Sequence, residues 1–268
     1  MLACKILAWG ALFAAPQKGK GILANHRPSG MQFNRRRQVD RPPAFVYGGE
    51  LSTIRPKGQV RVADTSSARM KKDTDATRNL PCLLIPKRHN DGRGWFSEIF
   101  HEKRLQGLGI ASRFVQDNQA SSKCRGTLRG LHFQLPPAAQ AKLVTVVRGR
   151  ILDIAVDVRR GSPTFGKHVS AELSAEEGRQ FYIPIGFAHG YLTLEDEVML
   201  MYKVSDYYAP SLDGGIYWGD PNIAFPWPIK QADLVVSDKD DRLPALKDFD
   251  SPFDYNGDAL GPLMAFNI

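Results

Sequence analysis

The chain has 268 residues, of which 43% are hydrophobic and 10% aromatic, with 24 glycines and 18 prolines, a composition typical of a globular protein rich in strands and turns. Its net charge of +8 arises in the first eighty residues, which hold 15 lysines and arginines against 5 acidic residues, whereas the remainder holds 21 against 23. The globular part is therefore nearly neutral, which excludes a nucleic-acid-binding surface there.

The sequence also argues against a membrane protein and against a protein with a cysteine-bound metal. The longest apolar run, residues 6–15, is too short to cross a bilayer, and no clean signal-peptidase site follows it, so a secretory signal is only the alternative. Cys4, Cys82 and Cys124 are odd in number and widely spaced, which indicates neither a disulfide framework nor a zinc site. We expect a cytoplasmic protein without membrane segment, metal or cofactor.

Residues 1–79 show neither sustained alternation nor a helical stripe, and they contain the cluster Arg35, Arg36 and Arg37. We predict a basic, poorly structured extension before a single domain that spans residues 80–268. A basic tail that contacts nucleic acid or an acidic surface is one alternative, and a natural start at Met70 is another.

From Leu80 onward, short apolar runs alternate with turn signals. Residues 83–86 are predicted to form a strand, residues 90–94 (NDGRG) a tight turn and residues 95–100 the returning partner strand. Residues 101–108 are predicted to form one short helix that ends at Gly109.

Residues 114–118 place Phe114, Gln116 and Asn118 on one strand face, so that two amides project together. Amides that face a cavity can bind hydroxyl or carbonyl groups, and the alternative is an ordinary polar strand face.

Residues 126–134, GTLRGLHFQ, combine a cation and a base in one short segment. Arg129 is a fixed cation, and His132 is the residue type suited to proton abstraction near neutral pH. Residues three apart in an extended strand point to opposite faces, so a shared ligand requires a bulge or bend near Gly130. A buried structural histidine beside a surface arginine is the alternative.

Residues 142–148 and 151–158 are predicted to form a hairpin joined at Gly149. In its second strand, alternation of apolar residues with Asp153, Ala155 and Asp157 predicts an antiparallel sheet with one buried face. Lys142 shares its strand face with valines, and a cation held there needs an anionic partner.

Two more candidate side chains follow. His189 comes at the start of a strand after the turn at Gly186, and Tyr202 falls on the apolar face of residues 198–204. Tyr202 is either a packed core residue or a positioned acid. Many short strands with almost no helix predict an all-β fold, an antiparallel sandwich or barrel of the jelly-roll type.

An ordered series of motifs runs from residue 83 to residue 246, in the order GRGWFSE, VQDN, GTLRGLHFQ, QAKLVTVVRG, DVRRGSPTFG, IPIGFAHGY, MYKVSDYYAP and VSDKD. In this series the chain resembles the dTDP-4-dehydrorhamnose 3,5-epimerases of the cupin superfamily. The resemblance implies a jelly-roll (cupin) barrel, a homodimer, and a role in making deoxysugar nucleotides for surface polysaccharide.

The resemblance also implies roles for individual residues. His132 corresponds to the catalytic base, Asp240 to its carboxylate partner, Tyr202 to the acid and Lys142 to the cation near the sugar oxygen that becomes negative. Positions that line the nucleotide-sugar site correspond to Arg93, Glu98, Gln116, Asn118, Arg129, His189 and Tyr208. His89 stands where the family often has an aromatic ring before the GxRG turn.

The implied reaction inverts C3 and C5 of dTDP-4-dehydro-6-deoxy-D-glucose through an enolate. The alternatives are an epimerase that acts on one centre, a ketoisomerase of a related dTDP-sugar, and a non-catalytic dTDP-sugar binding module. A metal-dependent cupin is a further alternative, but residues 132–134 read His-Phe-Gln where a metal site needs clustered ligands.

Overall fold

The structure is a computed structural model that describes residues 61–62, 78–255 and 257–268. The predicted extension of residues 1–79 lies outside the described residues except for 61–62 and 78–79, and Met70 and Cys4 lie outside them as well.

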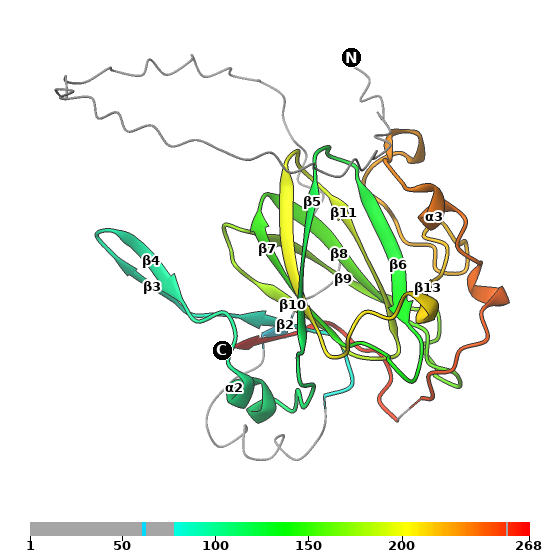
Figure 1. Cartoon of the computed structure of the whole chain (residues 1–268), viewed down its shortest axis with the longest axis horizontal. Helices are drawn as coiled ribbons and strands as arrows, with labels where there is room; N and C mark the ends of the chain where they lie inside the picture. The colour runs from blue at the N-terminus through cyan, green and yellow to red at the C-terminus, as the bar shows by residue number, and fades with distance from the viewer. Residues whose placement is uncertain (1–60, 63–77, 256) are drawn as a thin grey trace, which may run out of the picture. The chain divides into compact units, whose positions relative to one another are not determined.

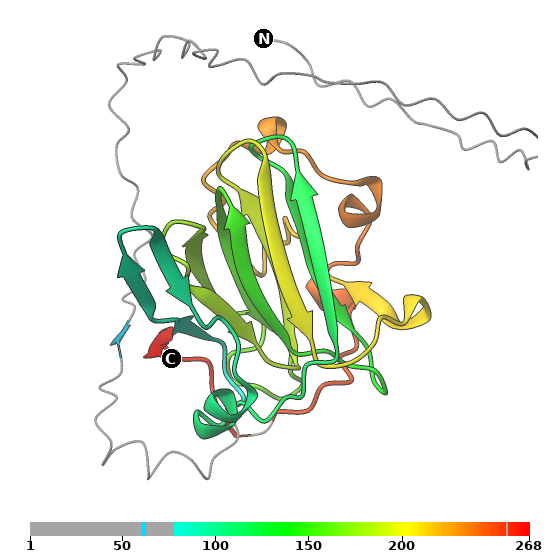
Figure 2. The ribbon, with the colours of Figure 1, turned by 60° about the vertical axis from the view of Figure 1, so that its left-hand side comes forward.

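Two β-sheets make up the body of the described chain (Figures 1 and 2). The first sheet has the strand order β1-β14-β2-β10-β7-β12-β5, and the second has the order β13-β6-β11-β8-β9. The strands of the first sheet are β1 (Arg61–Val62), β14 (Met264–Asn267), β2 (Cys82–Ile85), β10 (Gln180–Ile183), β7 (Lys142–Arg148), β12 (Val198–Val204) and β5 (Gln116–Ser122). Those of the second are β13 (Asp213–Gly215), β6 (Leu128–Gln134), β11 (Phe187–Thr193), β8 (Arg150–Asp157) and β9 (His168–Ser174).

A core of apolar side chains from both sheets fills the space between them. The first sheet contributes Leu83 and Val144, the second contributes Ala155 and Leu173, and all four side chains are fully buried. A sandwich with this strand order, in which neighbours in the sheet come from distant parts of the chain, confirms the predicted all-β jelly-roll fold.

The predicted hairpin of residues 142–148 and 151–158 is wrong. β7 pairs with β10 and β12 in the first sheet, whereas β8 pairs with β9 and β11 in the second. Gly149, with φ of +76°, turns the chain from one sheet to the other. Both strands turn apolar side chains into the same core, because alternation fixes which face is apolar but not which strand is the neighbour.

The prediction that β8 has one solvated face is also wrong, because every residue of this strand after Arg150 is buried. Its outward apolar residues pack against the C-terminal segment, where Ile216, Trp218 and Phe253 cover the second sheet. The polar face points inward, so the buried Asp153 lies on the side of the core.

The strand that begins at Gly94 has a different partner from the predicted one. β4 (Gly94–Ser97) pairs with β3 (Arg88–Asp91) rather than with β2, and it ends before Phe100. The β3–β4 hairpin extends away from the two sheets (Figure 1) and exposes 56% of Trp95 and 71% of Phe96. The predicted short helix is confirmed as α2 (Glu102–Gly107), which packs through Leu105 on the outer face of the first sheet.

The helices of the C-terminal segment are short, and they are η1 (Pro210–Leu212), η2 (Gln231–Asp233), α3 (Asp238–Asp241) and η3 (Leu246–Asp248). None of the helices among the described residues has the length and apolar character that a bilayer crossing needs.

Candidate active site

The site is organised by an irregularity in β6. His132 pairs with His189 and Arg129 with Tyr191, so that three steps along β6 match two steps along β11. The extra residue, Gly130, has φ of +121°, and a Cβ atom there would lie 2.6 Å from Cα of Gly190. The bulge that we predicted therefore brings Arg129 and His132 to the same face of the strand.

Asp240 lies beside this bulge and contacts the imidazole of His132. The distance from Nε2 of His132 to Oδ1 of Asp240 is 2.8 Å, and the backbone N–H of Gly130 donates to Oδ2 at 3.1 Å. α3 carries Asp240, and the hydroxyl of Ser237 caps this helix by accepting from the Asp240 N–H at 3.1 Å. Because Nε2 of His132 is bound to Asp240 and the imidazole is partly exposed, Nδ1 is the ring nitrogen that can contact a ligand.

Charge and burial act on Asp240 in opposite directions. Burial alone would raise the pKa of this carboxyl, but the hydrogen bonds from His132, Gly130 and Ser237 hold the pKa below its usual range. Asp240 is therefore ionised at neutral pH and can stabilise a protonated imidazole.

Lys142 is the first residue of β7, and its side chain points inward, toward β6. Its ammonium is buried, with 8% of the residue exposed, and donates to the backbone oxygen of His132 at 3.2 Å. Burial lowers the pKa of Lys142 to about 8, and the nearby carboxylates of Asp213 and Asp153 oppose this effect. These two carboxylates are the anionic groups that the sequence required.

The first sheet contributes Tyr202 and the two predicted amides. Tyr202 pairs across the strands with Asn118, and its phenol packs against the core between the sheets. Burial raises the pKa of Tyr202, against the opposing charge of Arg129. Gln116 donates to Oδ1 of Asn118 at 2.8 Å and accepts from the backbone N–H of Tyr208 at 3.0 Å, so the two amides do project together.

A second histidine–aspartate pair lies next to the first. Nε2 of His189 is 2.6 Å from Oδ1 of Asp153, and both side chains are buried. Burial lowers the pKa of His189, and the carboxylate of Asp153 acts against this. Sequence reasoning did not select Asp153 as a site residue, although an aspartate in a strand that is otherwise apolar was a signal that a partner is needed.

The remaining predicted residues are not all brought together. Arg129 is exposed and donates to the backbone oxygen of Ser121 at 3.3 Å, beside the site. Arg93 and Glu98 belong to the projecting hairpin and the residue that follows it, where Arg93 pairs with Asp91 at 2.6 Å and Glu98 with Arg104 at 3.1 Å. These two residues make no contact with His132 or Lys142 among the described hydrogen bonds and ion pairs.

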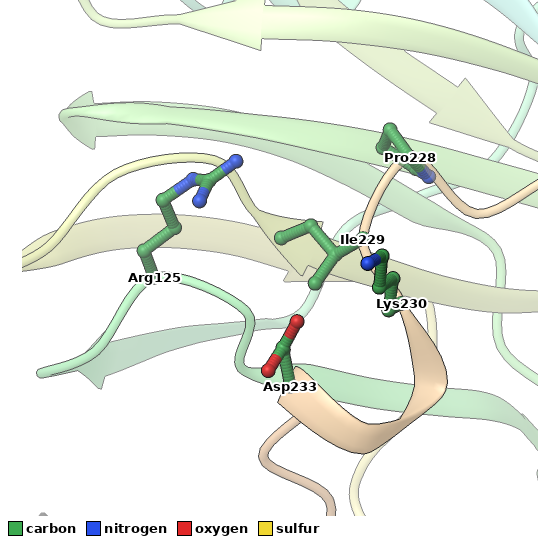
Figure 3. A pocket seen from close by; sticks show the side chains of 5 residues that line it. All are labelled: Arg125, Pro228, Ile229, Lys230 and Asp233. Carbon is green, nitrogen blue, oxygen red and sulfur yellow. The ribbon is translucent and has the colours of Figure 1, made fainter.

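A cavity of about 380 Å³ lies elsewhere, between the loop before β6 and the C-terminal segment (Figure 3). Arg125 and Asp233 line it together with residues 228–230, and it contains none of the predicted site residues. In the described part of the chain, no three His, Cys, Asp or Glu side chains are grouped so as to hold a metal ion.

A jelly roll of two β-sheets, with a histidine–aspartate pair, a buried lysine and a phenol close to the space between them, has the architecture of the cupins. The sequence profile of the dTDP-4-dehydrorhamnose 3,5-epimerases matches residues 81–248. The chain belongs to this family of isomerases.

Individual relatives agree with this assignment. A dTDP-4-dehydrorhamnose 3,5-epimerase of Sinorhizobium fredii is 48% identical over 173 residues, which cover 65% of this chain and 88% of the relative. The solved structure of a 3,5-epimerase from Legionella pneumophila in complex with dTDP-4-keto-L-rhamnose has 41% identity and a TM-score of 0.63, covering 68% of this chain and 98% of that one. A 3'-monoepimerase from Streptomyces bikiniensis in complex with dTDP-quinovose has 35% identity and a TM-score of 0.58, with coverage of 64% and 87%.

Proposed function

We propose that this protein inverts C3 and C5 of dTDP-4-dehydro-6-deoxy-D-glucose and so produces dTDP-4-dehydro-L-rhamnose. The observation that carries the proposal is the buried Asp240 on Nε2 of His132, with the ammonium of Lys142 bound to the backbone of the same histidine. Family membership supports the substrate class, and these two contacts support the proposed roles of His132 as base, Asp240 as its orienting carboxylate and Lys142 as cation.

Proton removal is the part of the reaction that His132 performs. The 4-keto group acidifies the protons on C3 and C5, and Nδ1 of His132 is the nitrogen left to accept them in turn. Asp240 fixes the tautomer of the ring and stabilises the imidazolium that forms, as a carboxylate does for a catalytic histidine.

Lys142 stabilises the intermediate. The 4-keto oxygen becomes an enolate as each proton leaves, so a buried ammonium beside it lowers the energy of the transition state more than that of the substrate. Tyr202, whose raised pKa keeps the phenol protonated, donates its own proton to the opposite face of the sugar ring, and exchange with solvent then restores the neutral imidazole and the phenol before the second centre reacts.

The nucleotide part of the substrate is held by the remaining residues. The guanidinium groups of Arg129 and Arg93 suit the diphosphate, and the amides of Gln116 and Asn118 suit hydroxyl or carbonyl groups. Glu98, His189 and Tyr208 complete the proposed binding set.

Deuterium incorporation tests this proposal. In D₂O, with the substrate and a coupled reductase, the product should carry deuterium at both C3 and C5 by NMR. His132→Ala should bind dTDP as the native protein does but lose roughly a hundredfold to ten-thousandfold in rate. Tyr202→Phe should retain exchange but fail to invert both centres, and exchange at the native rate in His132→Ala would exclude His132 as the base.

A second candidate function, inversion of one centre only, is favoured by the likeness to the Streptomyces 3'-monoepimerase. The same NMR experiment separates the two, because a monoepimerase leaves deuterium with inverted configuration at a single carbon.

We further infer that the protein acts as a homodimer. The β3–β4 hairpin that extends from the sheets exposes Trp95 and Phe96, and a second copy of the chain is the partner that we propose to cover them. The few, widely spaced cysteines favour a reducing compartment, so we place the reaction in the cytoplasm, in deoxysugar synthesis for surface polysaccharide.

A further inference from the structure

Arg88 joins the β3–β4 hairpin to a turn between strands of the two large sheets. It is the first residue of β3, and its guanidinium donates from Nη2 to the backbone oxygen of Ala175 at 2.8 Å and from Nη1 to the backbone oxygen of Glu176. Both acceptors lie in the turn between β9 and β10, 87 and 88 positions later in the chain. The planar fork of an arginine suits two neighbouring carbonyl oxygens, whereas an ammonium is a single point of charge.

The turn between β9 and β10 is held by hydrogen bonds of its own. The N–H of Gly178 donates to the backbone oxygen of Ser174 at 3.0 Å, and the N–H of Glu177 donates to the Ser174 hydroxyl at 3.1 Å. These bonds close the turn without using the carbonyl groups of Ala175 and Glu176, which accept from Arg88 instead. The guanidinium therefore binds a turn that is already fixed.

Gly178 leaves the space that the guanidinium occupies. Its φ of +68° lies in the left-handed region, and a Cβ atom there would lie 2.6 Å from Nη2 and 3.1 Å from Cζ of Arg88. A side chain at position 178 would therefore displace the guanidinium from the turn.

The same guanidinium lies over the ring of Trp95. Its Cζ is 4.1 Å from the ring centroid, which is within the range of a cation–π contact. Arg88 lies opposite Ser97 in the β3–β4 pairing, so Trp95 is its diagonal neighbour on the same face of the hairpin. Arg88 thus connects one of the two exposed aromatic rings of the hairpin to the turn between β9 and β10.

A two-stranded hairpin has little stability of its own, so its direction depends on the contacts at its base. β3 and β4 belong to neither of the large sheets. We propose that Arg88 is a positioning residue that holds the β3–β4 hairpin on the turn between β9 and β10, and so fixes Trp95 and Arg93 in place before a second copy of the chain binds. The consequence for Arg93 rests on the proposed function, because that function assigns its guanidinium to the diphosphate.

Hydrogen exchange of the backbone amides of residues 89–96 tests the inference. Arg88→Met keeps the length of the side chain and removes the guanidinium, and it should speed this exchange about tenfold, because opening of the hairpin no longer breaks charged hydrogen bonds. Arg88→Lys should recover part of the protection, since an ammonium can still stack on Trp95 and reach one carbonyl oxygen. Lys87→Met, at the exposed neighbouring residue, removes the same charge and should leave the exchange unchanged.

A variant in the turn tests the same contact without changing the hairpin. Gly178→Ala should speed exchange in the hairpin about as much as Arg88→Met, because the added Cβ takes the place of the guanidinium. Gly161→Ala is the matched control, because its φ of +78° imposes a similar strain while no described atom lies within 4 Å of the added Cβ. The faster exchange should persist together with Phe96→Asp, where the proposed second copy no longer covers the hairpin. Native exchange rates in Arg88→Met overturn the inference.

Steady-state rates connect the hairpin to the site. A loosened hairpin places Arg93 less often, so Arg88→Met should raise KM about tenfold while kcat changes by less than about twofold. A purely structural role for Arg88 predicts a smaller active fraction, and a lower kcat at unchanged KM would contradict the link to Arg93. If the native protein fails to epimerise the substrate, the proposed function falls, but the exchange rates still decide whether Arg88 holds the hairpin.

Discussion

Lys142 shows how burial and charge oppose each other at a single residue. Burial lowers the pKa of its ammonium to about 8, while Asp213 and Asp153 act to keep it protonated. The charged form that the enolate requires is therefore present at neutral pH and is lost just above it.

The pH dependence of the reaction should follow from this value. We expect kcat to fall as the pH rises through about 8, because a neutral amine no longer stabilises the enolate oxygen. Lys142→Arg, which stays protonated, should move this fall to higher pH. Rates from pH 6 to pH 10 at saturating substrate check the expectation, and a native profile that is flat between pH 7 and pH 9 would contradict it.

Lys142→Met should affect activity and stability in opposite directions. The folded pKa lies below the unfolded value, so the buried ammonium destabilises the fold while it is protonated, and this penalty declines as the pH rises from about 8 to 10.5. Methionine should raise the free energy of unfolding at pH 7 by up to about 3 kcal/mol, with a smaller gain at pH 10. The loss of kcat should be about a hundredfold to a thousandfold. Urea denaturation at both pH values measures the first effect.

At the residue scale, the sequence predicted where chemistry-bearing side chains point better than what they contact. Alternation placed Lys142 and Tyr202 on inner faces, and the glycine at position 130 indicated the bulge. Asp213 carried no such signal, because the three residues of β13 are too few for a periodic pattern and their partner strand is not adjacent in the sequence.

At the scale of elements, β6 depends on Gly130 for the register that sets His132 opposite His189. A Cβ atom at position 130 would lie 2.6 Å from Cα of Gly190 and 2.7 Å from the backbone oxygen of His189. Both are backbone atoms of the neighbouring strand, which cannot move without displacing the site.

Gly130→Ala should therefore destabilise the fold by about 2–3 kcal/mol and lower kcat, since φ of +121° is strained for alanine and β11 must shift. Gly92→Ala, in the hairpin turn with no atom within 4 Å of its added Cβ, is the matched control and should change stability little. Chemical denaturation and steady-state rates of both variants give the comparison. Equal stability of the two variants would show that β6 tolerates a side chain at the bulge.

The elements themselves also show where prediction from sequence stops. The strands β7 and β8 were expected in nearly their observed positions, but the predicted pairing between them was wrong. Hydrophobic alternation is the same for a hairpin and for two strands of different sheets that share a core. The outer cover of β8 comes from Trp218 and Phe253, which are more than sixty positions later in a segment without periodicity.

At the scale of the whole molecule, the β3–β4 hairpin, whose course is visible in Figure 2, exposes two aromatic side chains, Trp95 and Phe96. Phe96→Asp should shift the protein from dimer to monomer, because a carboxylate in a dry interface lacks a partner. Light scattering after gel filtration measures the mass. Phe165→Asp, at an exposed aromatic residue of the turn between β8 and β9, is the control and should leave the dimer intact. A native protein that is monomeric at micromolar concentration would contradict the dimer.

Dimers of two different variant chains can show whether Arg93, in the β3–β4 hairpin, serves the site of its own subunit or that of the partner. If Arg93 serves the site of the other subunit, combining chains that carry His132→Ala with chains that carry Arg93→Ala should recover part of the activity. If Arg93 serves its own site, the mixture should stay as inactive as its components.

The separation between His132 and Asp240 has a consequence for how the protein is made. The two residues are 108 positions apart, and Asp240 lies in the segment that covers the outer face of the second sheet. During synthesis, His132 emerges from the ribosome well before Asp240, the carboxylate that orients its imidazole. A chain that ends between these two residues lacks the cover of the second sheet and the carboxylate partner of His132. We therefore expect such truncated chains to be inactive.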